Sequence, residues 1–166
     1  MTSPDPTDAQ QAQFDDDRRF GSVDRAYGRE VTPDLAQRHA VVVGLGGVGS
    51  WASEALARSG LGQLTLIDLD HVAPSNINRQ VHALDCTVGQ AKVLAMRERI
   101  GGINQACTVD VVEEFVDADN VQNTIPVSAD VVLDCTDQVS AKAAMVLSAR
   151  ERGQRLIVCG AAGGKT

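Results

Sequence analysis

The sequence lacks long apolar runs, a basic N-terminal start and closely spaced cysteines. A transmembrane helix needs about 20 predominantly apolar residues, so no membrane segment is predicted. A secretory signal needs a basic start followed by an apolar stretch, and the N-terminus has neither. Cys86, Cys107, Cys135 and Cys159 form no Cys-x-x-Cys pair, which argues against a zinc site or a redox pair. These absences predict a cytoplasmic protein with reduced thiols.

The chain has little net charge outside its N-terminal tail. The formal charge of the 166 residues is -7. Residues 1–17 contain five acids and no base, which leaves 17 acids against 15 bases in residues 18–166. We therefore expect a disordered acidic tail at 1–17 and one folded domain at 18–166. This balance argues against a globally basic nucleic-acid binder but leaves room for a local basic site.

From residue 40 onward, short apolar runs alternate with segments of helical spacing. Strands that alternate with helices predict an α/β fold: a Rossmann-like, doubly wound, mostly parallel sheet with helices on both faces. Trp51 falls in the first helix and is expected to pack. We expect strands at 40–43, 64–67, 108–112, 131–133 and 156–159, and helices at 48–59, 91–100, 118–124 and 141–152.

Ligands of such sheets bind beyond the carboxyl ends of the strands. In this sequence the first expected strand runs into Gly44-Leu45-Gly46-Gly47-Val48-Gly49, which fits G-x-G-x-x-G between a strand and a helix. Glycine permits the tight turn and the close approach of a phosphate, and the following helix offers free N–H groups. The pattern therefore predicts a nucleotide site.

The loop and the acid that follows it do not identify the nucleotide. Asp68 ends the second strand, 24 residues after Gly44, and a carboxylate there suits the ribose of either NAD or ATP. The residues after Asp70 favour ATP, because Arg79 and Lys92 can stabilise charge on phosphate oxygens. Asp137, at a later strand end, can hold Mg²⁺ as a hard oxygen ligand.

The ordered motifs resemble a known family. They are Gly-x-Gly-Gly-x-Gly, Asp-x-Asp, Asn-x-x-Arg-Gln, Val-Gly-x-x-Lys and Asp-Cys-Thr-Asp, and they occur in this order. From Arg19 to Thr166 the chain is similar to the ubiquitin-activating-enzyme-like adenylyltransferases, the ThiF/MoeB/HesA group. Within the group, Gly49-Ser50-Trp51-Ala52 and Arg79-Gln80-Val81-His82-Ala83-Leu84 look most like the tRNA threonylcarbamoyladenosine dehydratase branch.

The resemblance implies a role for each motif residue. Asn76, Arg79 and Lys92 would contact the phosphates, with Arg79 and Lys92 stabilising the adenylation transition state. Arg19 or Arg25 would reach the triphosphate of the partner subunit in a homodimer. The remaining implied roles are the phosphate loop for Gly44, Gly46, Gly47 and Gly49, nucleotide binding for Asp68 (at the ribose) and Asp70, and Mg²⁺ binding for Asp137.

The implied reaction is ATP-dependent adenylation of a carboxylate. In the dehydratase branch this carboxylate is on tRNA carrying threonylcarbamoyladenosine, and the acyl-adenylate closes to the cyclic form and releases AMP. Three alternatives stay open: activation of a sulfur-carrier protein that ends in Gly-Gly, as in the ThiF and MoeB branches; an NAD-dependent oxidoreductase; and a fragment that only binds nucleotide or dimerises. The resemblance also implies that the family fold continues beyond Thr166, so a catalytic cysteine or a zinc site would lie outside this sequence. A sulfur-relay protein is a further partner that the family allows.

Overall fold

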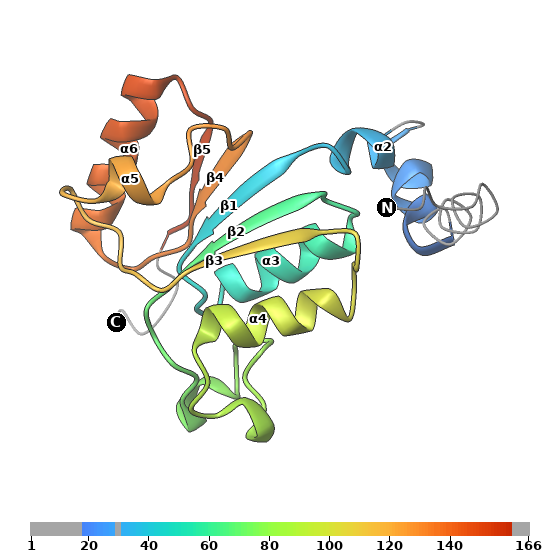
Figure 1. Ribbon diagram of the computed structural model, residues 1–166, viewed down its shortest axis with the longest axis horizontal. Helices are drawn as coiled ribbons and strands as arrows, with labels where there is room; N and C mark the ends of the chain where they lie inside the picture. The colour runs from blue at the N-terminus through green and yellow to red at the C-terminus, as the bar shows by residue number, and fades with distance from the viewer. Residues whose placement is uncertain (1–17, 29–30, 161–166) are drawn as a thin grey trace, which may run out of the picture.

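A computed structural model describes residues 18–28 and 31–160, and their fold is built on one parallel sheet (Figure 1). The strand order is β3-β2-β1-β4-β5, and every pairing is parallel. The strand order reverses between β1 and β4, which is where ligands of such sheets bind. The strands are β1 (His39–Val43), β2 (Gln63–Ile67), β3 (Thr108–Val112), β4 (Val131–Asp134) and β5 (Leu156–Val158).

Helices cover both faces of the sheet, as predicted for a doubly wound fold (Figure 1). On one face α3 and α4 pack, and on the other lie α5 and α6. Among the described residues no helix is long and apolar enough to cross a membrane. The helices are α2 (Val31–Leu35), α3 (Gly49–Arg58), α4 (Lys92–Gly101), α5 (Val121–Thr124) and α6 (Val139–Arg152), with short 3-10 turns at Pro74–Asn76 and Asp85–Thr87; residues 18–27 are also helical.

Strand β1 belongs to two hydrophobic cores, because successive side chains of a strand point to opposite faces. Ala40 and Val42 pack in the core beneath α3 and α4. Val41 and Val43 pack in the core beneath α5 and α6. All five residues of β1 are buried, which explains why its sequence is a continuous apolar run instead of an alternating one.

The predicted elements are confirmed, with one marked difference in length. A helix was expected over 118–124, but α5 begins only at Val121. The carboxylate of Asp117 accepts the backbone N–H groups of Asp119 and Asn120, and these bonds hold the preceding residues in a turn. The expected acidic tail, residues 1–17, lies outside the described residues.

Candidate functional site

A cavity of about 680 Å³ opens at the carboxyl ends of the strands. Its volume is in the range that small-molecule sites occupy. It gathers residues that lie more than 90 positions apart in the sequence, from the glycine loop to the turn after β4. Nine of the residues singled out from the sequence line it: Gly44, Gly46, Gly47, Asp68, Asp70, Asn76, Arg79, Lys92 and Asp137.

The glycine loop needs its glycines for different reasons. Gly44 has a φ of +87°, and a Cβ there would lie 3.1 Å from the backbone between Cys135 and Thr136. A Cβ on Gly49 would lie 1.8 Å from the carbonyl oxygen of Gly44, so this position accepts only glycine. A Cβ on Gly46, which lines the cavity, would meet nothing within 4 Å. Gly49 therefore closes the turn, whereas Gly46 leaves space in the cavity.

The loop presents free backbone N–H groups to the cavity. The N–H of Leu45 donates to Asp68 Oδ2 at 2.6 Å and fixes the start of the loop. The N–H groups of Gly46, Gly47 and Val48 have no hydrogen-bond partner within the described part of the chain. Helix α3 begins directly afterwards, at Gly49. Free N–H groups next to a helix N-terminus attract anions, and phosphates above all.

Two alanine substitutions should distinguish the glycine that the fold of this loop requires from the glycine that ATP binding requires. We expect Gly49→Ala to destabilise the fold by about 2 kcal/mol or more, because the backbone must move to relieve the clash. We expect Gly46→Ala to leave the unfolding temperature within about 2 °C of wild type and to weaken ATP binding at least about tenfold, because its methyl group intrudes where a phosphate approaches. Thermal unfolding and ATP titration measure both effects, and equal ATP affinity for Gly46→Ala and wild type would contradict this assignment.

Asp68 is buried at the end of β2, where it links the two nearest loops. Besides the Leu45 N–H, it accepts the N–H of Asp70 at 2.8 Å. Burial raises the pKa of Asp68, and these two N–H bonds together with the charge of Lys92 oppose that shift. Each carboxylate oxygen therefore has a fixed backbone partner and keeps a second lone pair, which a ligand hydroxyl can use.

Backbone pairing at the neck of a long loop brings Lys92 to Asp70. His71 and Ala91 form an antiparallel bridge, and the Lys92 N–H donates to the Asp70 carbonyl at 2.9 Å. The Lys92 ammonium then lies 2.8 Å from Asp70 Oδ2 and 3.9 Å from Asp68 Oδ2. The Lys92 side chain is only 7% exposed and lines the cavity, so water screens its charge little.

Arg79 lines the cavity and is held by its own loop. Its Nη1 donates to the Ser75 carbonyl at 2.7 Å, and its side-chain carbons pass within 4 Å of the position of a Gly47 Cβ. Trp51 was expected to pack, but this was wrong: its side chain is 54% exposed and its indole N–H donates to the Arg79 carbonyl at 3.0 Å. Nearby, Asn76 Oδ1 accepts the N–H of Ala73, which leaves its amide nitrogen for a ligand.

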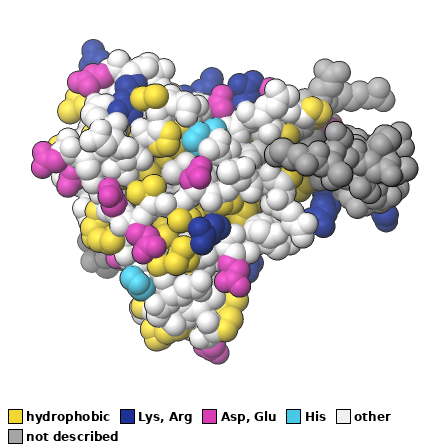
Figure 2. Space-filling view, viewed as in Figure 1, with side chains coloured by type: hydrophobic (Ala, Val, Ile, Leu, Met, Phe, Trp, Pro, Cys, Tyr) yellow, Lys and Arg dark blue, Asp and Glu magenta, His cyan; other side chains and the backbone are white. Residues whose placement is uncertain are grey.

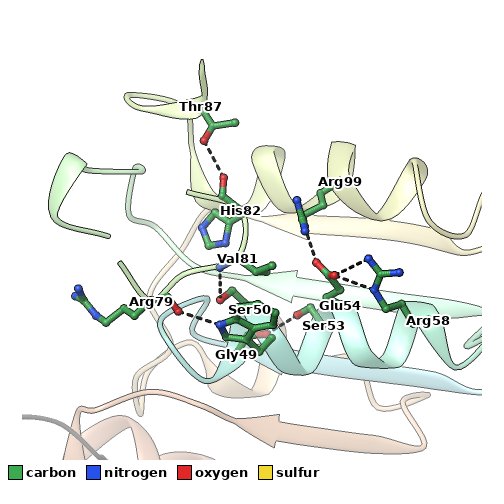
Figure 3. A network of polar contacts seen from close by, with 11 residues as sticks. Gly49, Ser50, Ser53, Glu54, Arg58, Arg79, Val81, His82, Thr87 and Arg99 are labelled. Atoms are coloured by element: carbon green, nitrogen blue, oxygen red, sulfur yellow. Dashed lines mark hydrogen bonds and ion pairs between the residues drawn. The ribbon is translucent and has the colours of Figure 1, made fainter. Parts of the chain in front are cut away.

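A polar network ties this loop to α3 and α4 (Figure 3). Ser50 Oγ, at the start of α3, accepts the N–H of Val81 at 3.3 Å. Glu54, one turn further along, pairs with Arg58 of its own helix and with Arg99 of α4. Burial would raise the pKa of Glu54, but the hydrogen bonds and charges of the two arginines lower it. The network fixes α3, and with it the phosphate loop, relative to the Arg79 loop.

The sequence prediction missed a buried ion pair that shapes the turn after β4. Asp134 is fully buried and accepts the N–H and the hydroxyl of Thr136, at 3.0 and 2.7 Å. Lys142 of α6 donates to Asp134 Oδ2 at 3.0 Å and to the Cys159 carbonyl at 2.8 Å. This arrangement holds the turn that presents the exposed Asp137 to the cavity. The signal was present in Asp-Cys-Thr-Asp, whose first acid is the buried Asp134.

The thiols near the cavity are suited to packing more than to chemistry. Cys135 lines the cavity, and its sulfur lies 3.9 Å from that of Cys159 on the neighbouring strand. Burial, followed by the neighbouring Cys159, raises the pKa of Cys135 to about 12. A thiol so rarely ionised is a poor nucleophile. All four cysteines are free, as predicted.

Arg19 and Arg25 lie away from the cavity of their own chain. Residues 18–28 sit at the amino ends of the strands, the end of the sheet opposite the cavity (Figure 1). Phe20 is buried there and packs against Gly60, and Arg19 Nη1 donates to the Ile103 carbonyl at 3.3 Å. Contact of either arginine with a triphosphate would therefore require a second copy of the chain, and this role stays a prediction.

Known proteins share both the sequence and the fold. Escherichia coli tRNA threonylcarbamoyladenosine dehydratase is 48% identical over 148 residues, covering 89% of this chain and 55% of that protein. Molybdopterin-synthase adenylyltransferase of Salmonella typhimurium is 41% identical over 118 residues, covering 71% of this chain and 47% of that protein. The crystal structure of the E. coli dehydratase in complex with ATP matches with a TM-score of 0.86 at 47% identity, covering 90% of this chain and 62% of that one.

These relatives agree with the family that the motifs indicate. The chain spans about half the length of the curated relatives it matches. A structure of E. coli MccB with succinimide shares the fold at 26% identity, with a TM-score of 0.73 over 78% of this chain and 39% of that one. The ThiF family profile matches residues 22–166. The chain belongs to the ThiF family.

Proposed function

We propose that this chain forms the ATP site of an enzyme that adenylates a carboxylate. The observation that carries the proposal is that one cavity is lined both by the glycine loop, with its free N–H groups, and by the cations Arg79 and Lys92. A dinucleotide needs no such pair of cations near its phosphates, whereas a triphosphate under attack does. The E. coli relative whose structure contains ATP supports the same nucleotide.

The residues suit a reaction that depends on positioning and charge. The substrate carboxylate attacks the α-phosphorus of ATP, the bond to the β-phosphate oxygen breaks, and pyrophosphate leaves with the electron pair. An ionised carboxylate needs no general base, so the catalytic work is alignment and neutralisation of charge. Arg79 and Lys92 carry that work, and Asp68 would hold the ribose.

The charge of the cavity indicates that further positive charge arrives with the ligands. Asp68, Asp70, Glu114 and Asp137 line it against only two cations, for a formal charge of -2. Within the described residues no group of three or more metal-ligating side chains exists. Asp137 fits a Mg²⁺ ion held mainly by phosphate oxygens and water, the arrangement usual for this ion with nucleotides. When bound, Mg²⁺ would neutralise phosphate charge.

A second copy of the chain would supply a further cation. Arg19 and Arg25 are exposed at the far end of the sheet, so a homodimer can bring one of them to the partner's triphosphate. Such an arginine would offset the negative charge of the cavity and stabilise the departing pyrophosphate. We propose this homodimer on the combined basis of the family resemblance and the charge deficit.

We propose tRNA carrying threonylcarbamoyladenosine as the substrate. The 48% identity to the E. coli dehydratase supports this branch, and a tRNA substrate agrees with the expected cytoplasmic location. On the face shown in Figure 2, basic and acidic side chains are interspersed without a continuous basic patch. Contacts with tRNA on this face would therefore be local. The 41% identity to molybdopterin-synthase adenylyltransferase favours a second candidate substrate, a sulfur-carrier protein ending in Gly-Gly.

Pyrophosphate exchange tests the proposal. We expect the protein, given Mg²⁺ and tRNA bearing threonylcarbamoyladenosine, to incorporate labelled pyrophosphate into ATP, and Arg79→Ala to lower the rate about 10²-fold or more. Arg97→Ala, which removes an exposed cation from α4, is the matched control. Exchange that depends on a Gly-Gly carrier protein instead of tRNA would select the second candidate. Exchange unaffected by Arg79→Ala would refute the mechanism.

A further inference from the structure

The register of β4 and β5 brings together two cysteines that lie 24 positions apart in the sequence (Figure 1). Asp134 pairs with Val158 in the parallel sheet, and the N–H of Cys159 donates to the Asp134 carbonyl at 2.9 Å. Cys135 therefore lies opposite Cys159, and their two sulfurs are 3.9 Å apart. No Cys-x-x-Cys spacing predicts this pair, because the sheet creates it.

The backbone around the two cysteines has the geometry that a disulfide needs. Neighbouring strands lie about 4.7–4.9 Å apart, and disulfides join residues whose Cα atoms are about 4.4–6.8 Å apart. Both residues are held in place: the Cys135 N–H donates to the Val43 carbonyl at 2.8 Å, and the Cys159 carbonyl accepts Lys142 Nζ at 2.8 Å. The sulfurs can therefore approach each other by rotation about the Cα–Cβ bonds, without movement of the strands.

We infer that Cys135 and Cys159 form a site of reversible oxidation, at which a low-molecular-weight disulfide such as oxidised glutathione converts the two thiols into one disulfide. Cys135 lines the cavity, and Cys159 directly precedes Gly160, which also lines it. The bond therefore forms in the cavity wall of the empty site, and a nucleotide that covers Cys135 hinders it. Only this protection by nucleotide rests on the proposed function; the formation of the disulfide does not.

The oxidation proceeds in two thiol–disulfide exchange steps. Cys159 reacts first, because burial, followed by the neighbouring Cys159, raises the pKa of Cys135 to about 12. The Cys159 thiolate attacks one sulfur of oxidised glutathione, the sulfur–sulfur bond breaks, and one glutathione leaves with the electron pair and takes up a proton. Cys135 then loses its proton to water and attacks the Cys159 sulfur, and the second glutathione leaves in the same way. The closeness of the two sulfurs compensates for the small thiolate fraction of Cys135.

Treatment of the whole chain with oxidised glutathione, followed by alkylation of the remaining thiols and peptide mapping, tests the inference. Without nucleotide we expect a peptide pair joined through Cys135 and Cys159. Saturating Mg-ATP should slow its appearance at least about tenfold, because only the small fraction of empty sites reacts. The oxidised protein should unfold at the same temperature as the reduced protein or above it, because the cross-link restricts the unfolded chain. Cys159→Ser should form no such bond, whereas Cys107→Ser, the matched control at another partly buried thiol, should form it normally.

The outcomes separate this inference from the proposed function. A cross-link through Cys86 or Cys107, or a glutathione adduct at Cys159 that never closes, overturns the inference. An oxidised protein that unfolds well below the reduced one overturns it as well, since the strands would then have to move. Equal rates with and without Mg-ATP overturn the protection by nucleotide if calorimetry shows that ATP binds. If calorimetry shows no binding, the proposed function fails, and the peptide map still decides whether the disulfide forms.

Discussion

Replacement of Lys92 by methionine should lower the rate of pyrophosphate exchange by about 10²–10³-fold. Methionine fills nearly the same volume, so the change removes the charge with little effect on packing. The effect is large because Lys92 lines the cavity and its side chain is only 7% exposed. A cation in such a dry position stabilises developing phosphate charge far more than one in water. Initial rates of pyrophosphate exchange for Lys92→Met and wild type give the ratio.

The same substitution has a second consequence that can be measured separately. Lys92 lies between Asp68 and Asp70, and its charge lowers the pKa of Asp68. In Lys92→Met the pKa of Asp68 should therefore rise further, which carbon-detected NMR titration of the carboxyl group can follow. Arg97→Met, a cation removed from the exposed side of the same helix, controls for net charge. Exchange within about threefold of wild type would contradict the role given to Lys92.

Replacement of Asp134 by alanine should destabilise the fold by about 3–5 kcal/mol. Asp134 is fully buried and accepts three hydrogen bonds, from Lys142 and from the N–H and hydroxyl of Thr136. Its loss leaves the Lys142 ammonium, whose side chain is only 18% exposed, without its counter-ion. For a chain of this size, such a loss lowers the unfolding temperature by roughly 10 °C. Chemical denaturation gives the free energy directly.

A double variant shows whether the destabilisation comes from the lost Asp134–Lys142 ion pair or only from the lost side-chain volume. Asp134→Ala combined with Lys142→Met removes both charges, so its loss should be clearly smaller than the sum of the two single losses. Additive losses would mean that the two charges do not interact. Because this pair shapes the turn that carries Asp137, we also expect the Asp134→Ala protein to bind Mg-ATP more weakly even at temperatures where it is folded.

The sequence allowed the sheet and most of the cavity wall to be predicted, for a simple geometric reason. Apolar runs such as 40–43 reveal buried strands, and parallel strands place their carboxyl ends on one edge. Glycine and acid residues that follow those runs must then meet, whatever the details of packing. Gly44, Asp68 and Asp137 reach the same cavity in this way.

The contacts made by side chains from other elements could not be predicted. The pairing of Lys142 with Asp134 depends on how α6 crosses the sheet. The approach of Lys92 to Asp70 depends on the bridge between His71 and Ala91, which closes the loop at 72–90. Trp51 falls in a helix and was expected to pack, but it lies at the surface, where its indole N–H donates to a backbone carbonyl. That Gln80 Oε1 has no hydrogen-bond partner among the described residues becomes visible only once every neighbour has been placed.

Because β1 lies at the centre of the sheet, nucleotide binding at the loop that follows it should stabilise the whole domain. Its residues alternate between the two hydrophobic cores. The helices on one face of the sheet therefore cannot unfold without disturbing the core on the other face. The phosphate loop is the direct continuation of this strand. A ligand held by the loop therefore resists the cooperative opening of both layers together, and amide hydrogen exchange should slow under saturating ATP in β4 and in α6 as well as around Gly46.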